Sequence, residues 1–283
     1  YFLMHGLRLK TVQPVRVDPA SRGSVMHYVF QNILDCYGSD FEHASDGELE
    51  EKVRELLDEY ERLYLGGSFG KSEKYKADYR SLRRACMEVL LNIREEYRRS
   101  KFRPEKFEYV LSAESGRSVL SIPIGSSGGR VKINLRGVVD RVDSYTASDG
   151  KKYIRIIDYK TGSKEFRFED VYNGINLQML LYMLALTEGI SPEFSDCIPA
   201  GVLYMRAGYL RCEPADSESD SPAGREKRAA KQLERSGLVI SNDEIIAAMD
   251  YDISGDFAAV KAAKSSKTGY TKWSSLIPED CFK

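Results

Sequence analysis

Two hydrophobic stretches in the middle of the chain carry charged residues of types that can do chemistry. Residues 137–143 read GVVDRVD and residues 156–162 read IIDYKTG. Side chains alternate between the two faces of a strand, so Asp158 and Lys160 point the same way. An aspartate and a lysine at the end of an apolar face are costly to bury without a purpose. If the two stretches pair as neighbouring strands, Asp140, Asp158 and Lys160 converge.

Two carboxylates beside one ammonium suit metal-assisted hydrolysis of a phosphodiester. Carboxylate oxygens are hard ligands of the kind that Mg²⁺ and Mn²⁺ prefer. Such an ion lowers the pKa of a bound water and neutralises the charge that builds on the phosphate, while a nearby lysine stabilises the transition state. The alternative is an ordinary ion pair at the end of a strand, and the triplet of Asp158 to Lys160 taken alone favours that alternative.

Hydrophobic periodicity predicts the elements that must position these residues. Apolar spacing, with a capping box between Ser45 and Glu48, predicts helices over residues 21–36, 45–64 and 72–99. Runs rich in β-branched and aromatic residues predict a meander of about four strands over residues 107–113, 118–123, 131–145 and 153–159. A helix over 173–188, a strand over 200–207 and helices near 226–235 and 242–249 follow. This order predicts an α/β fold with a mixed central β-sheet flanked by helices.

We expect one domain over residues 1–283. It comprises a mainly helical portion, a catalytic sheet with its following helix, a polar turn-rich loop whose composition predicts disorder, and C-terminal helices. These parts are residues 1–104, 105–212, 213–225 and 226–283. The chain begins at Tyr1 without a methionine, and we expect it to be a fragment of a longer protein.

Composition limits the classes of function. The 42 Lys and Arg residues against 43 Asp and Glu residues give a net charge of −1, so an anionic partner must be bound by a local patch or a metal ion. The five cysteines form no CxxC pair, which argues against a zinc ribbon and favours a reducing cytoplasm. No apolar run approaches the roughly 18 residues of a membrane span. The sequence has no GxxxxGK[ST] loop, so we expect no ATP hydrolysis.

Several motifs occur in an order that resembles one family. They are Tyr1–Lys10, Gly23–His27, Gly137–Asp143, Ile157–Gly162, Leu177–Tyr182 with its QxxxY pattern, and Ser236–Asp250. In this order they resemble the PD-(D/E)XK nucleases of the RecB-like type, and among these the C-terminal nuclease domain of AddB, one of the two chains of bacterial ATP-dependent helicase–nucleases. The resemblance covers nearly the whole chain and implies the restriction-endonuclease-like fold.

The resemblance also implies a metal site. By resemblance, Asp140 and Asp158 are ligands of Mg²⁺ or Mn²⁺, and the backbone carbonyl of Tyr159 is another ligand. His27 reaches in from the first helix as a further ligand, which is chemically reasonable because imidazole tolerates Mn²⁺ well. Lys160 is then the catalytic lysine.

Four other residues have roles that the sequence defines less fully. By resemblance, Gln178 and Tyr182 lie one turn apart on a helix, complete the catalytic site and touch the DNA strand; amphipathic packing is the alternative. Arg141 contacts a DNA phosphate or pairs with Asp143, and the sequence leaves both open. Glu108 falls where the family often has a glutamate, but we expect an exposed strand carboxylate.

The implied function is a divalent-metal-dependent deoxyribonuclease domain, an exonuclease that hydrolyses single-stranded DNA. By resemblance it belongs to an AddAB-type helicase–nuclease in double-strand-break repair, with an AddA-type subunit as partner. The family's iron–sulfur cluster is not expected in this chain, because Cys281 has no cysteine close to it in sequence. The alternative is a catalytically silent nuclease-fold module that guides DNA or holds the complex together; the presence of Asp140, Asp158 and Lys160 argues against it.

Overall fold

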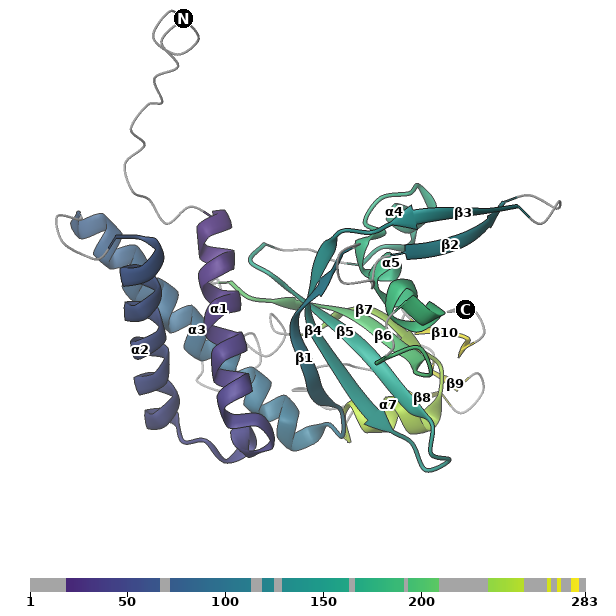
Figure 1. The fold of residues 1–283 in the computed structure, drawn as a ribbon. Helices are drawn as coiled ribbons and strands as arrows, with labels where there is room; N and C mark the ends of the chain where they lie inside the picture. Colours follow the sequence, from purple (N-terminus) through teal and green to yellow (C-terminus); the bar gives the residue numbers. More distant parts are fainter. Residues whose placement is uncertain are drawn as a thin grey trace, which may run out of the picture.

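The structure of the chain is a computed structural model. It describes residues 19–66, 72–112, 119–124, 129–162, 166–190, 193–208, 234–251, 264–265, 269–270 and 276–279 (Figure 1). Several predicted features lie outside the described residues: the motif at 1–10, the loop at 213–225, most of the helix at 226–235, and Cys212 and Cys281. Of the helices that the structure describes, none combines the length and the apolar character needed to cross a membrane.

Three long helices form the N-terminal portion, as the sequence predicts. The helices of the described chain are α1 (Pro19–Tyr37), α2 (Asp46–Tyr64), α3 (Glu73–Arg99), α4 (Phe168–Tyr172), α5 (Gln178–Ala185) and α7 (Asp243–Met249), with the 3₁₀ helix η2 (Gly38–His43) and the π-helix η3 (Leu186–Ile190). The capping box at the start of α2 is confirmed. The Glu48 N–H donates to the Ser45 hydroxyl at 3.3 Å, and the Ser45 N–H donates to the Glu48 carboxylate at 2.9 Å. These bonds satisfy donors that the start of a helix leaves open.

The central sheet has six strands in the order β1-β4-β5-β6-β7-β10. The strands of the described chain are β1 (Arg103–Leu111), β2 (Val119–Ile124), β3 (Gly129–Asn134), β4 (Gly137–Thr146), β5 (Lys152–Lys160), β6 (Ile198–Arg206), β7 (Ser236–Ile240), β8 (Lys264–Ser265), β9 (Gly269–Tyr270) and β10 (Leu276–Ile277). β5 pairs with β6 in parallel and β7 with β10 in parallel, whereas the other neighbours are antiparallel. The predicted mixed sheet is therefore confirmed. The helices α4 and α5 lie in the crossover that a parallel pair requires.

The strand connections differ from the predicted meander in three ways. β1 pairs with β4, while β2 and β3 form a separate two-stranded sheet between them in sequence. The helix predicted over 173–188 is broken near Gly174 and Asn176, whose φ angles are 74° and 60°. Residues 226–283 were expected to be helical, but they contribute β7 and β10 to the sheet. β7 is a short, almost wholly buried apolar run, and periodicity alone does not distinguish such a strand from a buried helical segment.

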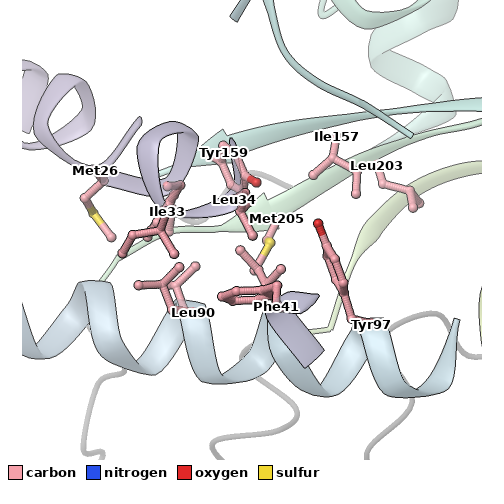
Figure 2. Close-up of a cluster of buried hydrophobic side chains, with 14 of the residues drawn as sticks. Met26, Ile33, Leu34, Phe41, Leu90, Tyr97, Ile157, Tyr159, Leu203 and Met205 are labelled. Carbon is pink, nitrogen blue, oxygen red and sulfur yellow. The ribbon is translucent and has the colours of Figure 1, made fainter. Parts of the chain in front are cut away.

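Helices cover both faces of the sheet. On one face α1, α2, α3 and α7 enclose buried sheet side chains that include Ile157, Tyr159, Leu203 and Met205. Figure 2 shows these side chains facing α3, with residues of α1 beside them. On the other face α5 and η3 pack against Ile154, Ile156 and Val202. Full burial of one such aliphatic side chain contributes about 1.5–3 kcal/mol, so both faces hold β5 and β6 firmly in place.

Candidate active site

The two strands that carry the predicted catalytic residues separate where those residues begin. The predicted pairing of β4 with β5 is confirmed, and its register ends with Arg141 opposite Ile157. Beyond that pair, the Tyr159 N–H donates to Asp140 Oδ2 at 2.7 Å. A side-chain carboxylate therefore takes over the bonding of a strand N–H, which keeps the donor satisfied while the two backbones part.

β1 is distorted at the same level of the sheet. In the β1–β4 register, Glu108 falls at the level of Asp140. Glu108 has a φ of 44°, which lies in the left-handed region. A non-glycine residue adopts this region at a cost of about 1–3 kcal/mol, and such strain concentrates at functional sites. The distortion turns the Glu108 carboxylate toward α1.

Three polar side chains from three elements meet at this point. His27 Nδ1 lies 3.0 Å from Glu108 Oε1, and His27 Nε2 lies 3.6 Å from Asp140 Oδ2. One ligand atom from each of the three residues lies within 4.8 Å of the other two. His27 comes from α1, Glu108 from β1 and Asp140 from β4. The helical portion therefore completes a site whose other members come from the sheet.

Burial and neighbouring charges shift the pKa values of this cluster. Burial disfavours the charged imidazole of His27, but the hydrogen bond with Glu108 and the charge of Asp140 outweigh it and raise the pKa of His27 above 6.5. Burial raises the pKa of Asp140 to about 7, against the charge of His27 and together with the charge of Asp158. Carboxylates held this close in a partly buried site favour a bound cation.

The donor set fits a divalent cation. Carboxylate oxygens suit Mg²⁺, and carboxylate oxygens with one imidazole suit Mn²⁺. The 3.6 Å between His27 Nε2 and Asp140 Oδ2 is too long for a hydrogen bond. It is the spacing of two neighbouring ligands that each lie about 2.1 Å from one ion. The backbone of Tyr159 faces the same ring, since its hydrogen bond with His27 also raises the pKa of His27. This contact supports the expectation for the Tyr159 carbonyl.

Asp158 and Lys160 form an ion pair beside this cluster. Lys160 Nζ lies 2.6 Å from Asp158 Oδ2, and Asp158 is only 5% exposed. Both residues were predicted to be on one face of the strand, and their contact agrees with that prediction. Asp158 is not among the three residues whose donor atoms are mutually within 4.8 Å. Its carboxylate instead faces the ammonium, and its charge acts on Asp140.

The QxxxY pair is arranged differently from the expectation. The Gln178 amide Nε2 donates to the Tyr182 hydroxyl at 2.9 Å, so the two side chains share one face of α5. Gln178 is exposed, whereas Tyr182 is 6% exposed. A Cβ atom at Gly137 would lie 1.8 Å from the Tyr182 hydroxyl oxygen, so the tyrosine packs directly on the first residue of β4. The expected contact of Tyr182 with DNA is corrected, because the side chain is buried and anchors α5.

Arg141 is buried, which contradicts its predicted contact with a DNA phosphate. The residue is 1% exposed. Its Nε and Nη2 atoms donate to the two carboxylate oxygens of Asp143 at 2.5 Å and 2.7 Å. The structure therefore shows the other alternative that the sequence leaves open, the pairing of Arg141 with Asp143.

Arg141 and Asp143 belong to a buried ionic network with Glu96 of α3, Arg155 of β5 and Arg235, the residue before β7. The Arg155 guanidinium donates to Asp143 at 2.9 Å and to Glu96 at 2.7 Å. Arg235 donates to the other Glu96 oxygen at 2.9 Å. These contacts tie α3 to β4, β5 and the start of β7, and so they fix the helical portion on the sheet that carries the cluster.

Glu108 was expected to be an exposed strand carboxylate, and the structure corrects this. Its side chain is 30% exposed and contacts His27. The sequence could have indicated this only through the register that sets Glu108 level with Asp140. A register depends on which strands pair, and a hairpin intervenes between β1 and β4 in the sequence.

Curated relatives share one description, the B-type chain of an ATP-dependent helicase/deoxyribonuclease. The relative from Clostridium novyi (strain NT) is 31% identical over 287 residues, covering 100% of this chain and 25% of the relative. The relative from Acetivibrio thermocellus is 30% identical over 289 residues, covering 100% of this chain and 24% of the relative. For Thermoanaerobacter sp. (strain X514) the identity is 32% over 271 residues, covering 93% and 23%. The chain thus spans about a quarter of the length of these relatives.

A family model described as the PD-(D/E)XK nuclease superfamily matches residues 1–264. The match includes β4, β5 and α5, which carry the acidic residues, the lysine and the QxxxY pair. The mixed sheet with helices on both faces agrees with the fold that the motifs imply. We therefore conclude that this chain belongs to the PD-(D/E)XK nuclease superfamily.

Proposed function

We propose that this chain is a divalent-metal-dependent nuclease domain that hydrolyses phosphodiester bonds of single-stranded DNA. The observation that carries the proposal is the cluster of His27, Glu108 and Asp140, with the ion pair of Asp158 and Lys160 beside it. Because the relatives are called chains of a helicase/deoxyribonuclease, we further propose an AddAB-type assembly as the context, with an AddA-type partner and a role in double-strand-break repair.

His27, Glu108 and Asp140 would hold the ion, with the Tyr159 carbonyl as a further ligand. When bound, a divalent ion lowers the pKa of a coordinated water and neutralises charge on the phosphate. The chain's own groups do the rest. Asp158 holds the Lys160 ammonium in place at 2.6 Å. The ammonium is thereby positioned to stabilise the negative charge that develops on the phosphate in the transition state.

Gln178 is the exposed polar group at the start of α5 that we assign to substrate binding. Tyr182 fixes the amide because its hydroxyl accepts from Gln178 Nε2 at 2.9 Å while its ring is packed on Gly137. The amide can then donate to a phosphate oxygen or a base edge of a DNA strand. Tyr182 is thus a positioning residue for Gln178.

Cleavage of labelled single-stranded DNA with Mg²⁺, Mn²⁺ or EDTA tests the proposal. We expect metal-dependent cleavage by the parent chain and a loss of about 10²–10³-fold or more in Lys160→Ala, as for removal of one transition-state contact. Asp158→Ala should lose activity comparably. Asp149→Ala is the matched control, because Asp149 lies in the exposed turn at the other end of β4 and β5.

Calorimetry with Mn²⁺ separates two kinds of negative result. Mn²⁺ binding that is lost in Asp140→Ala, without any cleavage by the parent, would mean an intact site in a chain that needs its remaining protein. Neither cleavage nor binding would refute the proposal and favour a catalytically silent module. Cleavage that persists in EDTA would refute metal dependence.

A further inference from the structure

β6 is the strand beside β5 on the side away from β4, and it ends at the same level as the proposed site. The two strands pair in parallel, with Asp158 opposite Tyr204 and Lys160 opposite Arg206. Neighbouring strands lie about 4.8 Å apart, and residues opposite each other in register project from the same face. Arg206 is thus a second cationic side chain next to Lys160.

The environment of Tyr204 supports this orientation. Burial raises the pKa of Tyr204 to about 12, and the charge of Asp158 contributes. Tyr204 is also buried in the same cluster as Ile154 and Ile156 of β5. Since side chains alternate along a strand, Arg206 follows Tyr204 on the face that carries Asp158 and Lys160. Arg206 itself is half-buried, so its stem is enclosed and its end reaches the surface.

The backbone holds Arg206 in a fixed position relative to Lys160. The Ala207 N–H donates to the Lys160 carbonyl at 2.8 Å, so the two strands remain bonded to their last residues. A Cβ atom at Gly208 would lie 2.6 Å from the Thr161 carbonyl oxygen, so only glycine permits the close approach that follows. A guanidinium on so well fixed a strand end loses less entropy on binding a ligand than one on a free loop.

The charges of the site leave a role for one more cation. Glu108, Asp140 and Asp158 carry three negative charges, which a divalent ion and Lys160 together balance when His27 is neutral. A bound phosphodiester adds one negative charge. The guanidinium of Arg206 balances it, and its planar fork matches two phosphate oxygens better than an ammonium does.

We infer that Arg206 is a substrate-binding residue that contacts a backbone phosphate of the nucleic-acid strand in the active site, an inference that rests on the proposed nuclease function. Lys160 acts on the phosphate that reacts, and Arg206 holds the strand through a phosphate beside it. Arg206 thus contributes to binding of the strand more than to the chemical step.

Binding and cleavage measured separately test this inference. The probe for binding is a fluorescent oligothymidylate in Ca²⁺, titrated at several salt concentrations. We expect Arg206→Gln to weaken binding about tenfold, as for loss of one charge-assisted hydrogen bond. We expect the slope of log affinity against log salt to fall by about 0.7, the value for one phosphate contact on a single strand. In cleavage assays KM should rise while kcat changes less than about threefold.

Two further variants define the outcome. Arg206→Lys should keep the salt slope, because it keeps the charge. Lys151→Gln is the matched control, since Lys151 lies at the far end of β5 with its side chain 59% exposed. An unchanged salt slope in Arg206→Gln, with thermal unfolding like that of the control, would overturn the inference. So would a fall in kcat with unchanged KM. The binding assay requires no cleavage, so a parent chain that binds DNA without cutting it would refute the proposed nuclease activity and still test Arg206.

Discussion

Replacement of Glu96 by glutamine is the sharpest test of the buried ionic network. The Glu96 carboxylate is buried and accepts hydrogen bonds from Arg155 at 2.7 Å and Arg235 at 2.9 Å. Arg141 lies 3.6 Å from the same carboxylate. Glu96→Gln keeps the shape of the side chain but leaves three buried guanidinium groups with the single carboxylate of Asp143. The amide also directs an N–H toward a guanidinium, where a donor finds no acceptor.

Removal of one partner from a buried ion pair costs about 3–5 kcal/mol, because the remaining charge stays buried without compensation. That is a large share of the about 5–15 kcal/mol that stabilises a typical domain. For a domain of this size we expect the melting temperature to fall by about 10 °C. Glu95→Gln is the matched control on the next position of α3, where the side chain is 51% exposed. That substitution should change stability by less than about 0.5 kcal/mol.

The pH dependence of unfolding gives the same test a second readout. Burial opposes ionisation of Glu96, but the charges of Arg235, Arg155 and Arg141 outweigh burial and hold its pKa well below 4.5. A carboxyl group with a lowered pKa in the folded state stabilises the fold above its unfolded pKa and loses this effect as the pH falls. Stability should therefore drop below about pH 4.5 in the parent and less steeply in Glu96→Gln. Urea titrations of both variants at pH 3.5 and pH 7 measure this. Equal stability of Glu96→Gln and Glu95→Gln at pH 7 would refute the reasoning.

Three further predictions concern other positions. Gly137→Ala should destabilise the fold by about 1–3 kcal/mol through overpacking against the Tyr182 ring, whereas Gly47→Ala, with no atom within 4 Å of the added Cβ, should not; denaturant midpoints compare them. Ser45→Ala should cost about 0.5–2 kcal/mol in the same assay, because it removes the capping box of α2. Glu108→Gln should weaken Mn²⁺ binding about 10–100-fold, measured by calorimetry, whereas Glu105→Gln on the same strand should bind Mn²⁺ like the parent.

The sequence predicted those parts of the structure that depend on local chemistry. The helices α2 and α3 begin at the capping serines that the sequence marks, because a cap needs only residues a few positions apart. The pairing of β4 with β5, and the contact of Asp158 with Lys160, follow from a short connection and from side-chain alternation. Family resemblance, and not spacing, directed attention to His27.

The remaining features depend on contacts between residues far apart in the sequence. Glu108 reaches His27 across 81 positions, and Glu96 reaches Arg235 across 139 positions. Periodicity contains no information on such pairs. Tyr182 matched its motif but not its expected role, because its burial depends on the absence of a side chain at Gly137. The motif thus identified the residue, and only packing showed what it does.

The buried network and the open site are two parts of one arrangement. A sheet normally stays closed through its backbone hydrogen bonds, yet the proposed metal site needs β4 and β5 to part at Asp140. The Asp143 carboxylate, three residues behind Asp140 on β4, accepts from Arg155 of β5 at 2.9 Å. This charge-assisted bond joins the strands just before they separate, and such bonds are about twice as strong as neutral ones. The opening between the strands is therefore held at one level of the sheet, where His27 and Glu108 reach Asp140.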